Sequence, residues 1–237
     1  IRSSLAKLAP PPKLTISQWA DKERRLSPEA SAEPGSWSTD RAPYQRGVMD
    51  AISNPKIETV VFMSGAQIGK TELLLNAIGF YICHDPAPIL VLQPTLSMGQ
   101  AFSKDRLAPM IRDTPALSGK VRDARARDSN NTTMTKGYPG GQISIVGANS
   151  SAGLASRPIR IVLADEIDRY PPSAGSEGDP VSLAQKRTAT FHNRKIVLTS
   201  TPTIAGNSRI ETAFEQSDQR RFFVPCHDCG VKDHLKW

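Results

Sequence analysis

Apolar residues gather in short, nearly continuous runs, and segments with apolar side chains at helical spacing lie between these runs. Strands that are hydrophobic at almost every position are typical of a parallel sheet covered by helices on both faces. From residue 43 onward this alternation predicts an α/β fold with a mainly parallel central sheet. Strands are predicted at 57–63, 89–93, 159–164 and 195–200, and helices at 44–53, 71–84, 97–112 and 180–191.

Three segments depart from the alternation. Residues 1–42 are rich in proline and predict an extended arm over the core, with a short helix within 16–25. Residues 132–136 and 142–146 predict a hairpin, and residues 170–178 predict a mobile surface loop. We therefore divide the chain into an N-terminal arm (1–42), a core (43–224) and the start of a linker or following domain (225–237).

A glycine-containing turn follows the first predicted strand. It reads Ser64-Gly65-Ala66-Gln67-Ile68-Gly69-Lys70-Thr71 and fits the pattern G-x-x-x-x-G-K-[ST], except that Ser64 replaces the first glycine. A loop between a strand and a helix points backbone N–H groups and the positive helix end at an anion. Lys70 would neutralise phosphate charge and the Thr71 hydroxyl would bind Mg²⁺. The competing interpretation is an ordinary corner with an exposed lysine.

Two adjacent acids, Asp165 and Glu166, follow an apolar predicted strand. Parallel sheets bind ligands at the carboxyl ends of their strands, so Asp165 would hold Mg²⁺ there. Glu166 would orient and polarise the water that attacks a γ-phosphate. The alternative is a pair of solvated loop acids. Together with the phosphate loop, the acids predict nucleotide hydrolysis.

Polar side chains stand at two further strand exits. Thr199, Ser200 and Thr201 lie where hydroxyls would bond a γ-phosphate or the attacking water. Hydroxyls that satisfy local backbone groups are the competing interpretation. Gln93 and Thr95 follow another strand, at an exit that would contact a nucleic-acid backbone.

In their order along the chain these motifs resemble the ATPase half of bacteriophage large terminase subunits, the lambda-type, gpA-like branch in particular. The resemblance runs from about Pro43 to the end. It implies a RecA-like P-loop NTPase fold and an ATP-driven motor that packages double-stranded DNA into a procapsid. Its carriers are Tyr44-Gln45-Arg46, the phosphate loop, Gln93-Pro94-Thr95, Asp165-Glu166, Thr199-Ser200-Thr201 and Pro225-Cys226-His227-Asp228-Cys229-Gly230.

The resemblance also implies roles for residues and partners. Tyr44 and Gln45 would recognise adenine, Lys70 and Asp165 would hold nucleotide and metal, and Glu166 would be catalytic. Implied partners are a small terminase subunit, a portal protein and further copies in a homo-oligomeric ring, in the host cytoplasm and without a membrane. Coupling of hydrolysis to movement would fall to Thr199, Ser200 and Thr201.

Two absences bear on the expected activity. Related motors often place an arginine in the phosphate loop, where this chain has Ala66 and Gln67. The missing charge would come from Arg157 or from a neighbouring subunit, and such an arginine is worth about 10³–10⁵ in turnover. We therefore expect slow hydrolysis by the isolated chain. No second set of strand-borne acids follows, so we do not expect this chain to cut DNA.

Composition and charge fit a globular, nucleic-acid-associated protein. The chain is 38% hydrophobic and 22% charged, and its apolar runs are shorter than a membrane-spanning helix requires. A net charge of +7 and a pI near 9.5 favour a polyanionic partner. A DNA-facing surface and a solvated face are equally open for the basic residues of the middle of the chain, which are Lys104, Arg106, Arg112, Lys120, Arg122, Arg125, Arg127 and Lys136.

The cysteines are three in number, too few for a disulfide framework, and they indicate a reducing setting. Cys226 and Cys229 form a C-x₂-C pair, and with His234 they are candidate zinc ligands. Structural zinc takes four ligands, so this is half a site. Two reduced thiols in a turn are the competing interpretation.

Two other functions compete with the packaging motor. A helicase-like, nucleic-acid-dependent ATPase lobe has similar motifs, but it needs a second RecA-like lobe for which 237 residues leave no room. A nucleotide-gated DNA-binding scaffold with vestigial hydrolysis would bind nucleotide without turnover.

Overall fold

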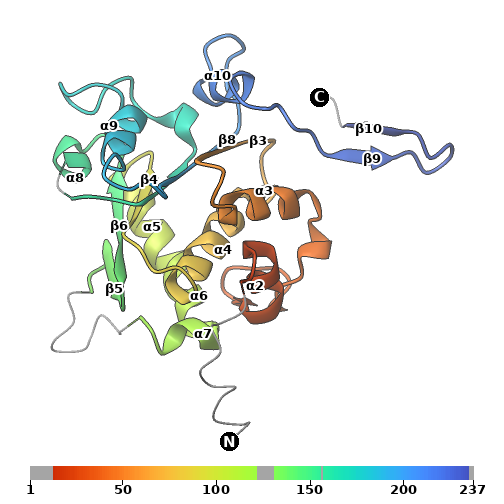
Figure 1. The fold of residues 1–237 in the computed structure, drawn as a ribbon, viewed down its shortest axis with the longest axis horizontal. Coiled ribbons are helices and arrows are strands. Elements are labelled where there is room, and N and C mark those ends of the chain that lie inside the picture. Colours follow the sequence, from red (N-terminus) through yellow and green to blue (C-terminus); the bar gives the residue numbers. More distant parts are fainter. Residues whose placement is uncertain (1–12, 122–130, 156, 235–237) are drawn as a thin grey trace, which may run out of the picture.

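The computed structural model describes residues 13–121, 131–155 and 157–234, and it centres on a six-stranded sheet (Figure 1). The strand order is β3-β8-β7-β4-β6-β5, in which β5 and β6 pair antiparallel and the other neighbours pair parallel. The predicted mainly parallel α/β sheet is therefore confirmed. The strands are β3 (Thr59–Met63), β4 (Ile89–Gln93), β5 (Thr135–Tyr138), β6 (Gly141–Gly147), β7 (Ile161–Asp165) and β8 (Lys195–Ser200).

Helices cover both faces of the sheet because successive strand residues point to opposite sides. In β4, Ile89 and Val91 join one core cluster, whereas Leu90 and Leu92 join the other. The first face carries α2 (Ile16–Glu23), α3 (Tyr44–Ser53), α4 (Lys70–Cys83), α6 (Ala108–Asp113) and α7 (Pro115–Ser118). The second face carries α8 (Ser151–Ala155), α9 (Pro180–Lys186) and α10 (Arg209–Glu215), and Figure 1 shows the two layers.

The N-terminal segment, predicted as an extended arm, supplies a helix to the core. Thr15 caps α2, and a reciprocal bond with Gln18 completes a capping box. Ile16 and Trp19 are fully buried in the same cluster as α4. The arm continues through η1 (Thr39–Arg41) and a pair of two-residue strands, β1 (Arg25–Leu26) and β2 (Gly35–Ser36).

The helix predicted at 97–112 is interrupted. It consists of α5 (Leu96–Ala101), the π-helical turn η2 (Phe102–Leu107) and α6. Pro109 has no N–H, and its ring would meet the carbonyl of residue 105 in an unbroken α-helix. A wider turn before this proline removes that conflict. The helix predicted at 180–191 is also shorter, because α9 ends at Lys186.

The predicted hairpin forms, with strand bounds that differ from the predicted 132–136 and 142–146. Its strands are β5 and β6, in which Tyr138 pairs with Gly141. Pro139 and Gly140 occupy the turn between them, and Gly140 has the positive φ of 85° that a type II turn requires. The hairpin places β5 at the edge of the sheet.

The segment 170–178, predicted to be a mobile surface loop, is fastened to the core. Tyr170 is buried and its hydroxyl donates to the Leu92 carbonyl at 2.9 Å. Ala174 is fully buried, and its N–H donates to the Gly178 carbonyl. The segment is an irregular loop, as expected, and Pro172, Gly175, Ser176 and Glu177 are exposed. Its burial at Tyr170 and Ala174 was not expected, because proline and glycine mark a turn without indicating how its other side chains pack.

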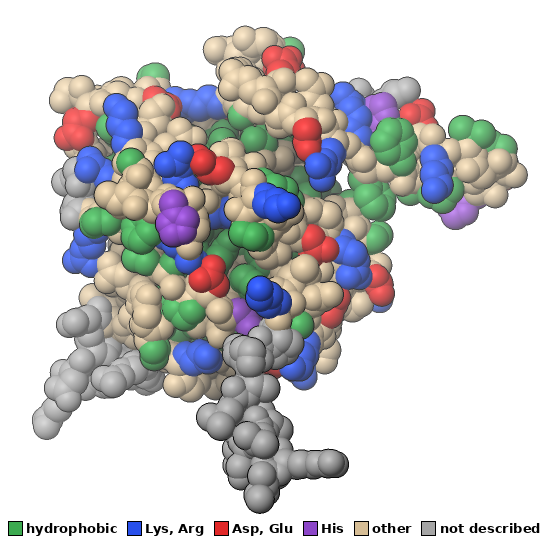
Figure 2. Space-filling model, in the orientation of Figure 1, with side chains coloured by type: hydrophobic (Ala, Val, Ile, Leu, Met, Phe, Trp, Pro, Cys, Tyr) green, Lys and Arg blue, Asp and Glu red, His purple; other side chains and the backbone are tan. Residues whose placement is uncertain are grey.

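A second hairpin, β9 (Phe223–Pro225) with β10 (Lys232–His234), projects from the body (Figure 1). Figure 2 shows apolar side chains along it, and Phe222, Phe223 and Val231 are exposed. At its base, the Phe222 ring meets the Tyr44 ring edge-on at 6.1 Å. Among the described residues, no helix has the length and apolarity that a bilayer crossing demands.

Gly79 tests the docking of the N-terminal helix. A Cβ at Gly79 would overlap the Trp19 ring. Gly79→Ala should therefore lower the free energy of unfolding by about 1–3 kcal/mol, because overpacking outweighs the ~1 kcal/mol that alanine adds in a helix. Urea denaturation measures this. Gly47→Ala in α3 is the matched control, since nothing lies within 4 Å of its added Cβ. Equal effects of the two substitutions would contradict the docking.

Candidate active site

The loop between β3 and α4 turns through two left-handed residues, Gln67 with φ 60° and Gly69 with φ 81°. Gly69 is the N-cap of α4, and a Cβ there would lie 2.6 Å from the Gln45 Nε2 atom. Both the positive φ and the close approach of α3 therefore require glycine. The loop delivers Lys70 and Thr71 to the first turn of α4, where backbone N–H groups lack helical partners.

Tyr44 and Gln45, predicted to recognise adenine, lie against this loop. The Tyr44 hydroxyl donates to the Ile68 carbonyl at 3.0 Å, and Gln45 Nε2 donates to the same carbonyl at 2.9 Å. Gln45 is buried, and its Oε1 atom has no hydrogen-bond partner among the described residues. The two side chains brace the loop and leave one buried acceptor unsatisfied.

Lys70 joins three parts of the site. Its side chain is 6% exposed, and its Nζ atom donates to the Gly65 carbonyl at 3.0 Å and to Thr201 Oγ1 at 2.7 Å. Nζ also lies 3.4 Å from the Glu166 carboxylate. These three partners account for the three protons of an ammonium group. The competing interpretation of an exposed lysine is therefore wrong.

Asp165 is buried at the end of β7. Thr199 Oγ1 donates to its Oδ1 atom at 2.8 Å, and Gln93 Nε2 donates to its Oδ2 atom at 3.4 Å. Burial raises the pKa of Asp165 above its ordinary value, against the opposing effect of the Thr199 hydrogen bond, and the nearby Glu166 charge raises it further. Because the hydrogen bonds do not offset the cost of burying this carboxylate, a bound cation would stabilise its charged form.

Glu166 follows in left-handed backbone, with φ 54° and ψ 50°. A non-glycine residue there is strained, and such strain clusters at functional sites. The turn directs its carboxylate to Lys70 on one side and to Arg169, at 3.8 Å, on the other. Glu166 is thus neither a freely solvated loop acid nor part of the sheet.

These residues line one hollow of about 360 Å³. It brings together the predicted residues Ala66, Gln67, Lys70, Thr71, Asp165, Glu166 and Thr201. The Thr71 hydroxyl and the Asp165 carboxylate are hard oxygen ligands of the kind that Mg²⁺ prefers. The hydrogen-bond donors to Asp165, Thr199 and Gln93, are both neutral, so the donor set fits such an ion. Ser64 stands at the edge of this set, where its N–H donates to the Ser200 carbonyl.

The three predicted coupling residues each contact a different partner. Thr199 donates to Asp165, Ser200 Oγ accepts from the Asp168 N–H at 3.2 Å, and Thr201 accepts from Lys70. The exit of β8 therefore touches both the phosphate loop and the turn that carries Glu166.

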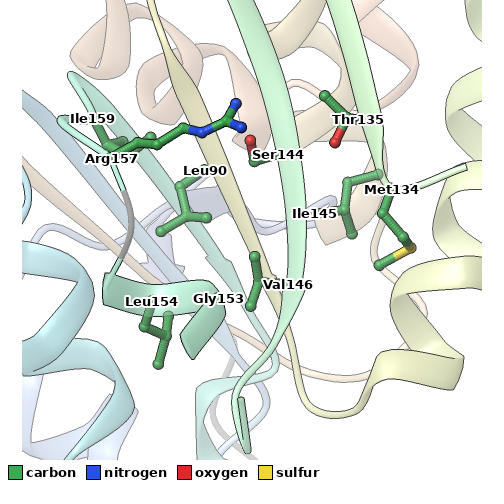
Figure 3. A pocket seen from close by; sticks show the side chains of 10 residues that line it. All are labelled: Leu90, Met134, Thr135, Ser144, Ile145, Val146, Gly153, Leu154, Arg157 and Ile159. Atoms are coloured by element: carbon green, nitrogen blue, oxygen red, sulfur yellow. The ribbon is translucent and has the colours of Figure 1, made fainter. Parts of the chain in front are cut away.

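The structure does not bring Arg157 into its own chain's hollow. Figure 3 shows Arg157 in a separate pocket, where it points toward Ser144 of β6 above Leu90. Arg157 precedes the five-residue strand β7 and Glu166 follows it, which separates them by roughly 16 Å at ~3.3 Å per residue. Arg157 is exposed, so it remains accessible from outside.

Sequence reasoning missed several residues of the site. Arg106 and Arg169 line the hollow as cations, and Gln93 holds Asp165 instead of standing free for a nucleic acid. Arg169 lies three residues after Glu166, which was an available signal. Arg106 lies far away in sequence, on the π turn η2, so only the fold reveals it.

The C-x₂-C pair does not form a complete metal site. In the described part of the chain, no group of three or more potential ligands gathers around Cys226 and Cys229. His234, the predicted third ligand, instead contacts Arg221 at 2.8 Å and Asp233 at 3.2 Å. Backbone hydrogen bonds from Cys229 and Asp228 lower the pKa of the Cys226 thiol.

The buried carboxylate of Asp165 should weaken the fold at neutral pH. Its folded-state pKa is raised, so the free energy of unfolding should fall as pH rises from the ordinary aspartate range through that raised value. Asp165→Asn should raise the free energy of unfolding at pH 7, because the asparagine amide places no charge in the buried site, and the gain should vanish in acid. Urea titrations across pH test this, with the exposed Asp218→Asn as control. A loss of stability at pH 7 would contradict it.

Residues 31–237 match the sequence family described as phage terminase large subunit gpA, ATPase domain. The chain is 33% identical over 239 residues to the terminase large subunit of Enterobacteria phage P21, and 28% identical to that of Escherichia phage lambda. Both similarities cover all of this chain and 37% of the relative, so the chain spans well under half of these proteins.

Solved structures show the same fold at low identity. The large terminase of bacteriophage HK97 has a TM-score of 0.68 at 11% identity, over 86% of this chain and 41% of that one. The large terminase ATPase domain of Thermus phage P74-26 has a TM-score of 0.52 at 14% identity, over 89% and 83%. The predicted RecA-like P-loop class is confirmed. The chain belongs to the gpA family of phage terminase large subunit ATPase domains.

Proposed function

We propose that this chain is the ATP-hydrolysing motor domain of a DNA-packaging terminase, which couples ATP hydrolysis to movement of double-stranded DNA into a procapsid. The observation that carries the proposal is the single hollow lined by Lys70, Thr71, Asp165 and Glu166. A phosphate-binding helix terminus and two strand-end carboxylates face the same space. Family membership supports the same activity.

Each residue has a defined part in the proposed reaction. Lys70 and the backbone N–H groups of residues 64–71 neutralise the β- and γ-phosphates. Thr71 and Asp165 would hold Mg²⁺, which supplies charge neutralisation at the phosphates when bound. Glu166 orients the attacking water and accepts its proton. Before nucleotide binds, its contact with Lys70 keeps the carboxylate beside the phosphate position.

Adenine recognition is proposed for Tyr44 and Gln45. The unsatisfied Gln45 Oε1 atom supports this role, because a buried acceptor without a partner is costly and an exocyclic amine can donate to it. Both side chains donate hydrogen bonds to the Ile68 carbonyl, so a base that moves either side chain would also move the phosphate loop.

The missing transition-state charge is proposed to come from Arg157 of a neighbouring copy in a homo-oligomeric ring. The exposure of Arg157 and its distance from its own hollow support action between copies. An isolated chain would then hydrolyse ATP slowly.

Double-stranded DNA is the proposed track, and a small terminase subunit and a portal protein are the proposed partners in the host cytoplasm. The net charge of +7 supports a polyanionic partner. Of the basic residues for which a DNA-facing surface and a solvated face were both open, Arg122, Arg125 and Arg127 lie outside the described residues. Arg106 contacts Ala30 and Arg112 contacts Glu29, both in the N-terminal segment, so these two arginines are less available for the phosphates of DNA.

Cys226 and Cys229 are proposed to supply two of the four ligands of a zinc site. The lowered pKa of Cys226 favours the thiolate that binds metal. His234 is engaged elsewhere, so further ligands must come from another segment or chain.

Two substitutions separate a motor from a scaffold. Lys70→Ala should abolish binding of a fluorescent ATP analogue, because the phosphates lose their buried cation. Glu166→Gln should retain binding and lower turnover by about 10²–10⁴-fold, the usual share of a general base. The exposed Lys56→Ala and Glu177→Gln are matched controls. Unchanged turnover in Glu166→Gln, or a wild-type chain that binds without hydrolysis, would sink the proposal.

A mixing experiment tests the shared arginine. Arg157→Ala and Glu166→Gln should each be nearly inactive under conditions where copies associate, with losses of about 10³-fold or more for the arginine. A mixture should regain turnover, because Arg157 from one variant completes the hollow of the other. Arg157→Ala with wild-type turnover, or a mixture no more active than its parts, would refute action between copies.

A further inference from the structure

Asp168 stands two residues after Glu166 and binds the segment that follows β8. Its Oδ2 atom accepts from the Thr203 N–H at 3.0 Å and from Thr203 Oγ1 at 3.2 Å. Its Oδ1 atom accepts from the Ile210 N–H at 2.8 Å, in the first turn of α10. Its own N–H donates to Ser200 Oγ. One residue therefore holds the β8 exit at three places.

Arg209 makes the reciprocal attachment. From the first residue of α10 its guanidinium donates to the carbonyls of Tyr170 at 2.7 Å and Pro171 at 2.8 Å. It also reaches the Ile167 carbonyl at 3.3 Å. The start of α10 and the turn after Glu166 are thus tied in both directions, above the fully buried Ile210.

This junction lies next to the reacting groups. Thr201, which accepts from Lys70, lies two residues before Thr203. Glu166, which lies beside Lys70, is two residues before Asp168. A phosphate that draws Lys70 away would release Thr201 and Glu166 together. Two residues after Thr201 and two residues after Glu166, the two segments are joined by the contact between Thr203 and Asp168.

We infer that Asp168 is a positioning residue for ATP hydrolysis, which fixes the turn carrying Glu166 to the segment carrying Thr201 and passes a displacement of either to α10. This inference rests on the proposed function. It assigns to Asp168 no contact with the nucleotide, because Asp168 does not line the hollow.

The chemistry of the junction requires a carboxylate. Burial alone would raise the pKa of Asp168, but hydrogen bonds from Ser208, Ile210 and Thr203 outweigh it and hold the pKa below its ordinary value. An asparagine of the same shape accepts at one oxygen only. Its NH₂ group would face the donors of either Thr203 or Ile210.

Asp168→Asn tests the inference, with Asp113→Asn as the matched control. Asp113 is another partly exposed aspartate with a lowered pKa, held by Arg112 on the opposite face. In Asp168→Asn, affinity for a nonhydrolysable ATP analogue should stay near wild type while kcat falls by roughly 10–10²-fold, as expected for a misplaced catalytic group. Analogue binding should also stop changing amide hydrogen exchange in residues 209–215. Asp113→Asn should keep the wild-type kcat and the wild-type change in hydrogen exchange on analogue binding.

The milder Thr203→Ala removes one donor and keeps the backbone N–H, so it guards against loss of folding. It should show a smaller fall in kcat and a weaker exchange response in the same residues. Wild-type kcat and exchange response in both variants would overturn the inference while leaving the proposed function intact. A wild-type chain without hydrolysis would overturn the proposed function first, and this inference with it.

Discussion

The ammonium group of Lys70 holds the site together. A buried cation is stable only when it is paired and hydrogen-bonded. Lys70 meets this requirement with one carbonyl of the phosphate loop, one hydroxyl at the β8 exit and the Glu166 carboxylate. An anion bound in the loop competes for the same protons. In the proposed reaction, phosphate binding would therefore change the surroundings of Glu166 and of Thr201 in one step.

The strand order makes this arrangement possible. β8 is the last strand of the sheet in the chain, yet it lies between β3 and β7. Its register sets Ser200 beside Met63 and Thr199 beside Asp165. Because the strands are parallel, their carboxyl ends finish at one edge, and the β8 hydroxyls stand between the loop and the acids. Thr199, Ser200 and Thr201 are thus neighbours of both the phosphate loop and the two acids by topology.

Much of the site followed from local signals. The strand before Ser64, the glycine before Lys70 and the paired acids after an apolar strand each have a short-range physical cause. The fold class followed from strands that are hydrophobic on both faces, a pattern that amphipathic strands of a one-sided sheet lack.

The remainder depended on contacts between distant segments. The burial of Trp19 against Gly79 cannot be read from a proline-rich segment, and neither can the ion pair at 2.8 Å between buried Arg24 and Glu72, beside Thr71. Arg157 was proposed from its residue type alone. It lies before the start of β7, whereas the hollow lies at the end of that strand. Gln93 holds Asp165 because the parallel register of β4 and β7, which pairs Leu92 with Ala164, brings the two strand ends together.

A structure of the chain with Mg²⁺ and a nonhydrolysable ATP analogue tests the central claim most directly. In that complex Lys70 Nζ should bind the β- and γ-phosphates and separate from Thr201 Oγ1, while Thr71 and Asp165 face the metal and Glu166 faces the γ-phosphate. A triphosphate bound outside the loop of residues 64–71, or a Lys70 that keeps Thr201 and Glu166 while nucleotide is bound, would contradict it.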